Sequence, residues 1–87
     1  MKDPQEDRFI HLVRLAWDLR YLGVATTVEL PLTGEPRVVM PRAVGDLRVT
    51  ALFQHGGWIF TWGRGRTQRV DAFSEDAVRR ILKAAAR

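Results

Sequence analysis

The N-terminal part of the chain has the hydrophobic pattern of an α-helix that begins at Pro4 and runs to Leu22. Asp3 is expected to cap this helix, and Gly23 suits the left-handed residue that ends many helices. At ~100° per residue, the polar positions fall in one narrow sector. They are Asp7, His11, Arg14 and Asp18. The apolar sector is much wider than the arc of about 100° that a helix needs when it lies on one sheet face.

This wide apolar sector leaves more hydrophobic surface than one sheet face covers. One flank carries Ile10, Trp17 and Tyr21, and the other is formed by Leu15, Leu19 and Leu22. Aromatic residues beyond the core-facing arc are typical of interface cores, and an exposed apolar patch promotes association. We therefore expect the first flank to meet a protein partner, most simply a second copy of the chain through a two-fold axis. The alternative is that the strands and a second helix cover both flanks.

From residue 24 onward the apolar positions alternate, which predicts strands with one buried face. The expected strands are 24–32, 37–40, 47–55, 58–62 and 67–71. Pro36 and Pro41 cannot donate to a ladder, so the strand between them is expected at a sheet edge or with irregular pairing.

The central hairpin has the clearest strand pattern. Gly56 and Gly57 suit a two-residue turn with positive φ angles. That turn would set three cross-strand pairs: His55 with Trp58, Phe53 with Phe60, and Ala51 with Trp62. All the large aromatic residues would then share one face. We expect them to be core if helices cover that face; an open face would instead be a stacking platform for nucleic-acid bases.

The next connection and the last helix complete the fold. A three-residue loop over 64–66 would set Val70 opposite Phe60 and turn Arg69 outward. Ser74 is expected to cap a final helix whose inner stripe is Ala77, Val78, Ile81, Leu82 and Ala85. The order is helix, four to five antiparallel strands, helix. It predicts an α+β fold with both helices packed on one face of a meander.

Length and composition exclude several classes of protein. The 87 residues are 46% hydrophobic, so the chain is not disordered, and they predict a single domain over residues 1–87. Uncharged apolar runs are too short for a transmembrane helix or a signal peptide, so we expect a cytoplasmic location. The chain has no cysteine, which excludes disulfides and thiolate zinc sites.

No catalytic constellation is evident, and we expect no enzyme activity, no cofactor and no metal. His11 lies beside Asp7 on the polar sector, where a His–Asp pair could exchange protons, but no nucleophile motif accompanies it. A solvated helix face is the expectation for His11, and turn packing against Trp58 is the expectation for His55. The Gly-x-Gly spacing at residues 63–65 lacks a third glycine and a following helix, so it is not a nucleotide loop.

The charge distribution offers an alternative function. The chain has a net charge of +4, and no carboxylate lies between Asp46 and Asp71. Arg64, Arg66 and Arg69, with Arg48 nearby, could contact phosphates on a protruding loop. Three arginines would give weak, salt-dependent binding of nucleic acid or another anion. GC-rich coding would explain the same excess of arginine without a function.

The helix, the strand from Trp58 to Trp62 and the segment from Phe73 to Val78 resemble parts of many small uncharacterised proteins of actinobacterial genomes. Such proteins are often encoded near regulator genes, so the resemblance implies an accessory or regulatory binding role and no catalytic residue. The element order is also similar to small dimeric secretion-chaperone-like folds, which is an analogy of fold alone. Those chaperones tend to be acidic, whereas this chain is basic. We therefore predict a non-enzymatic protein-interaction module, self-associating or adaptor-like.

Overall fold

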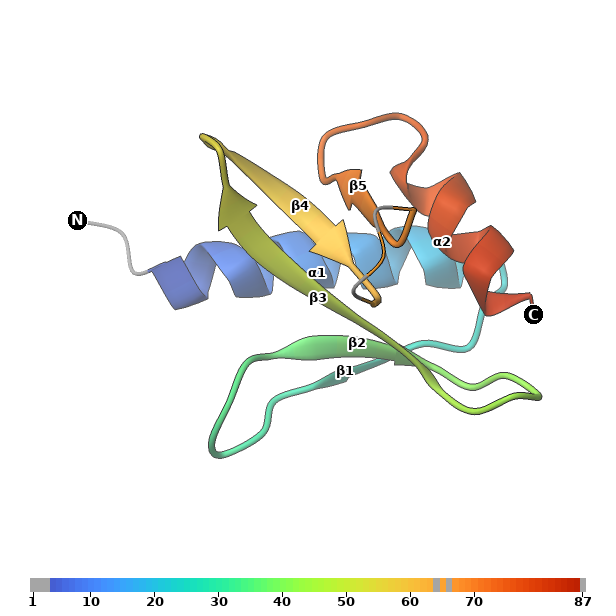
Figure 1. Cartoon of the computed structure of the whole chain (residues 1–87). Helices are drawn as coiled ribbons and strands as arrows, with labels where there is room; N and C mark the ends of the chain where they lie inside the picture. Colours follow the sequence, from blue (N-terminus) through green and yellow to red (C-terminus); the bar gives the residue numbers. More distant parts are fainter. Residues whose placement is uncertain (1–3, 64, 66, 87) are drawn as a thin grey trace.

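A computed structural model of the chain describes residues 4–63, 65 and 67–86. In this part of the chain, two helices pack on an antiparallel sheet of five strands (Figure 1). The helices are α1 (Pro4–Tyr21) and α2 (Ala77–Ala85). The strands lie in sequence order in the sheet and are β1 (Thr27–Glu29), β2 (Arg37–Met40), β3 (Leu47–Gln54), β4 (Gly57–Thr61) and β5 (Arg69–Asp71). The predicted α+β class and element order are confirmed.

Helix α1 ends as its sequence predicts. Gly23 has a φ of +84°, the left-handed conformation that glycine adopts at little cost. The N–H of Val24 donates to the Leu19 carbonyl at 3.0 Å, and the N–H of Gly23 donates to the Arg20 carbonyl at 2.9 Å. These two bonds form a Schellman motif, which satisfies carbonyls at the helix end. The predicted cap Asp3 lies outside the described residues.

The hydrogen bonding of the sheet changes sides within β3. Residues 47–49 pair with β2, whereas residues 50–54 pair with β4. No residue of β3 is paired on both sides. In Figure 1, β3 therefore runs diagonally between a β1–β2 hairpin on one side and β4 and β5 on the other. The sheet consists of two small halves that share one strand.

The β1–β2 hairpin differs from its prediction in two ways. Strand β2 lies between β1 and β3, so its expected edge position is wrong. Pro36 and Pro41 stand just outside its four residues, so neither proline removes a ladder donor. The strand predicted over 24–32 is paired only from Thr27 to Glu29, because the next position along β2 would be Pro36. Leu30 and Leu32, predicted on a buried face, are consequently exposed.

The register of the β3–β4 hairpin is shifted by two residues from the predicted one. The turn residues are His55, with a φ of +52°, and Gly56, with a φ of +80°, rather than Gly56 and Gly57. The observed cross-strand pairs include Phe53 with Trp58 and Ala51 with Phe60. A residue followed by glycine is the usual sequence of a type I′ turn, and this choice lets Gly57 join the ladder. A shift of two keeps every side chain on its predicted face.

The pairing of β5 was predicted correctly, whereas the start of α2 was not. Phe60 lies opposite Val70, as predicted, and Arg69 is exposed. Helix α2 begins at Ala77, later than predicted, and its N-cap residue is Asp76. The Ser74 hydroxyl instead accepts a hydrogen bond from the Asp76 N–H at 3.1 Å, which makes a turn before the helix.

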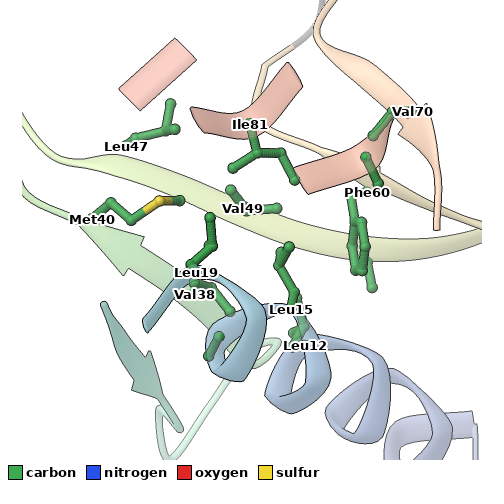
Figure 2. Close-up of a cluster of buried hydrophobic side chains, with 13 residues drawn as sticks. Leu12, Leu15, Leu19, Val38, Met40, Leu47, Val49, Phe60, Val70 and Ile81 are labelled. Atoms are coloured by element: carbon green, nitrogen blue, oxygen red, sulfur yellow. The ribbon is translucent and has the colours of Figure 1, made fainter. Parts of the chain in front are cut away.

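The hydrophobic core lies between the two helices and one face of the sheet. Figure 2 shows Val49 of β3 between Ile81 of α2 and the leucines of α1. The buried core residues are Leu12, Leu15, Ala16, Leu19, Val38, Met40, Leu47, Val49, Ala51, Phe60, Val70, Ala77 and Ile81. Trp58 and Trp62 are partly buried and pack against this cluster. The helices cover most of the aromatic face, so the prediction that it forms core is confirmed for Phe60. It is wrong for Phe53, which is 60% exposed at the end of β3.

The observed hairpin turn makes a testable prediction. His55 is a β-carbon-bearing residue at positive φ, where asparagine is better tolerated. We expect His55→Asn to raise the free energy of unfolding by about 0.5–1 kcal/mol, measured by urea denaturation. The control Gln54→Asn, in the extended backbone of β3, should not raise it. A decrease for His55→Asn would indicate a turn at Gly56 and Gly57, with His55 in the strand.

Candidate functional site

The outer face of α1, defined by Ile10, Trp17 and Tyr21, points away from the core. These side chains are 43%, 69% and 91% exposed, respectively. At 3.6 residues per turn they lie on the opposite side of the helix from the buried Leu12 and Leu19. The structure thus brings together the three residues predicted as an interface, on one exposed face. The second predicted flank is mostly core, since Leu15 and Leu19 are buried.

A groove continues from this face to the edge of the sheet. It has a volume of about 330 Å³ and runs between Val13 and Trp17 of α1 and Thr27 of β1. Strand β1 pairs only with β2, so its other side is an unpaired sheet edge. Arg14, also exposed, lies between Ile10 and Trp17 along the helix. The outer face therefore combines apolar side chains with the cation of Arg14, and the neighbouring groove adds the cation of Arg20 beside the unpaired edge of β1.

His11 is packed between aromatic rings, which the sequence did not reveal. Its ring centroid lies 5.1 Å from that of Trp58 and 5.3 Å from that of Phe73. Burial among these rings lowers the pKa of His11; Asp7 opposes this effect and Arg14 adds to it. The expectation of a solvated His11 is therefore wrong. His55 was expected to cover Trp58, but it lies exposed in the hairpin turn, and His11 takes that place.

The surroundings of His11 are those of a packing residue. A cavity of about 210 Å³ lies beside it, lined also by Asp18, Phe73 and Ser74. The Ser74 oxygen already accepts the Asp76 N–H, and no hydrogen bond joins Ser74 to His11 within the described residues. Phe73 is largely exposed and closes one side of the imidazole.

The predicted basic loop is only partly described. Arg64 and Arg66 lie outside the described residues. Arg69 is exposed on β5, and the cross-strand pairing places it on the same open sheet face as Arg48. The loop is shaped by Gln68, whose side-chain oxygen accepts the Gly65 N–H at 3.0 Å. A β-carbon at Gly63 would overlap this Gln68 amide, so a larger residue there would require the Gln68 side chain to move.

A second basic site was missed by the sequence reasoning. Arg42, Arg80 and Lys83 line a cavity of about 340 Å³ together with Trp62. Arg80 and Lys83 lie on α2, but Arg42 comes from the β2–β3 loop. No periodicity or motif connects residue 42 with residues 80 and 83, so only the tertiary fold reveals this cluster.

Comparison of the chain with protein-family models, with curated proteins and with solved structures gave no match. The resemblance to small actinobacterial proteins therefore stays a prediction. Over residues 4–63, 65 and 67–86, no helix is long and apolar enough to cross a membrane. The same residues contain no cluster of three or more His, Asp or Glu side chains able to hold a metal ion.

The packing of His11 predicts its titration. The lowered pKa means that the fold favours the neutral imidazole of His11. The neutral ring therefore contributes its full stabilisation above pH 6.5, the usual pKa. This stabilisation is lost as the pH falls through the lowered pKa of the folded state. An NMR titration should place the pKa of His11 below 6.5. Phe73→Ala, which exposes the ring, should raise that pKa. Phe53→Ala is the control, because Phe53 contacts Trp58 and not the His11 ring. An unchanged His11 pKa in Phe73→Ala would refute this account.

Proposed function

We propose that this protein is a non-enzymatic interaction module whose outer face of α1 binds a second copy of the same chain. One observation carries the proposal: Ile10, Trp17 and Tyr21 are exposed together on the side of the helix opposite the core. Large aromatic side chains supply most of the binding energy in many interfaces. Their exposure in a monomer this small is unfavourable unless a partner covers them.

The spacing of these residues suits an antiparallel pairing of two α1 helices. A two-fold axis between Arg14 and Trp17 would place Ile10 against the partner's Tyr21. The same axis would place Arg14 over the partner's Trp17, where the guanidinium and the indole ring attract each other. Each contact occurs twice, because a two-fold interface is made of the same surface on both copies.

The proposed interface is small, and this determines the expected behaviour. Four side chains per copy would cover an area at the low end for a specific dimer. The groove beside Thr27 can add further contact. We therefore expect a dimer that dissociates on dilution. A cytoplasmic setting is part of the proposal and is supported by the cysteine-free composition.

The second candidate function is weak nucleic-acid or anion binding through Arg64, Arg66 and Arg69. It is supported by the exposure of Arg69 on an open sheet face that also carries Arg48. The first proposal has the stronger support, because its three residues are exposed together on one face of α1.

Light scattering across a dilution series tests the proposal. The wild-type protein should show a mass near twice that of one chain at high micromolar concentration. Trp17→Glu should remain folded and monomeric, because a carboxylate would be buried in the apolar contact. Val44→Glu is the matched control: Val44 is 71% exposed, compared with 69% for Trp17, and lies in the β2–β3 loop. This control should dimerise like the wild type.

Two outcomes would overturn the proposal. One is a wild-type protein that is monomeric at high micromolar concentration. The other is a dimer that Trp17→Glu leaves intact or that Val44→Glu dissociates equally. Circular dichroism of each variant shows whether the fold is retained.

A further inference from the structure

A basic cavity lies apart from the proposed dimer contact, since none of Ile10, Arg14, Trp17 and Tyr21 lines it. Its walls come from α2, from the β2–β3 loop and from the segment before β5. The cationic side chains are those of Arg42, Arg80 and Lys83. Its volume of about 340 Å³ is in the range of small-ligand sites.

The two guanidinium groups are held by backbone carbonyls rather than by carboxylates. Arg42 donates from Nε to the Gly45 carbonyl at 2.7 Å and from Nη1 to the Ala84 carbonyl at 3.1 Å. Arg80 donates from Nη2 to the Thr67 carbonyl at 2.9 Å. Among the described residues, neither arginine nor Lys83 forms an ion pair. A guanidinium has five N–H donors, so both groups are positioned and still able to bind an anion.

The indole ring of Trp62 gives the cavity an aromatic wall. The guanidinium carbon of Arg80 lies 6.0 Å from the Trp62 ring centroid, which is a cation–π arrangement. Trp62 is only partly buried, and the hydroxyl residue Thr67 lines the same space. Aromatic rings and guanidinium planes both stack on nucleobases. The cavity therefore offers cations for a phosphate and flat surfaces for a ring.

Part of this charge has a structural role. Arg42 and Lys83 lie near the C-terminal end of α2, where cations are favourable. The bond from Arg42 to the Ala84 carbonyl uses one donor of Arg42 at this helix end, whereas Arg80 makes its bond elsewhere. Arg80 reaches across to Thr67, away from the helix end, and brings its charge over Trp62.

We propose that this cavity binds a nucleoside monophosphate. The three cations outnumber the two negative charges of a phosphate monoester by one, and bidentate contact from a guanidinium suits its oxygens. The indole ring of Trp62, in the wall of the same cavity, offers a surface on which the base would stack. The proposal is independent of dimerisation, because none of the residues of the outer face of α1 lines this cavity.

Calorimetric titration of the full chain with adenosine 5′-monophosphate tests the site. We expect a dissociation constant of about a millimolar or tighter, with inorganic phosphate and adenosine each about tenfold weaker. Lys83→Gln and Arg80→Gln should weaken binding of the monophosphate about tenfold. Arg79→Gln is the matched control on the same helix. Arg79 is exposed and paired with Asp76, and its removal changes the net charge equally.

Three results would overturn the proposal. The first is the absence of saturable binding of the monophosphate. The second is equal weakening in Arg79→Gln and Lys83→Gln, which would show attraction to net charge alone. The third is equally tight, Lys83-dependent binding of an oligonucleotide without terminal phosphates, which would show a strand-binding surface instead. Lys83 is exposed, so Lys83→Gln keeps the test valid if Arg80→Gln disturbs the fold.

Discussion

The packing of the leucine stripe of α1 is the interaction on which this fold depends. The sheet is divided within β3, so no ladder runs from β2 to β4 across one β3 residue. Helix α1 contacts β1, β2, β3 and α2, and its His11 ring reaches Trp58 on β4. Leu12, Leu15 and Leu19 therefore join the two sheet halves from one side (Figure 2). Without this helix, each half would be a small hairpin unit with marginal stability.

The small size of the chain links this packing to function. An 87-residue domain buries only about 60–65% of the surface of its unfolded chain. Helix α1 and the nine-residue helix α2 together cover the one face of the sheet that forms the core. The core stripe of α1 is narrow, so the remaining apolar residues of this helix lie on its outer side. A helix with a hydrophobic core face and a hydrophobic outer face is suited to connect its own sheet with a partner.

Local chemistry made much of the fold predictable. Hydrophobic periodicity indicated every element, and alternation placed the aromatic residues on the correct sheet face. The hairpin register was missed because Gly56 can end one two-residue turn or begin the next, and sequence spacing alone does not choose between them. The exposed face at Ile10, Trp17 and Tyr21 followed from the width of the apolar sector. The basic cavity could not be predicted from the sequence, because Arg42 and Arg80 come together only through long-range packing.

Disulfide cross-linking tests the central claim most directly, because the natural chain has no cysteine to interfere. The variants Ile10→Cys and Tyr21→Cys are mixed under mild oxidation, with Val44→Cys as the reference for collisional cross-linking. Antiparallel pairing of the outer faces predicts a mixed disulfide between positions 10 and 21 that forms faster than either variant cross-links alone. A mixed disulfide that forms no faster than the Val44→Cys dimer would contradict the pairing of two α1 helices.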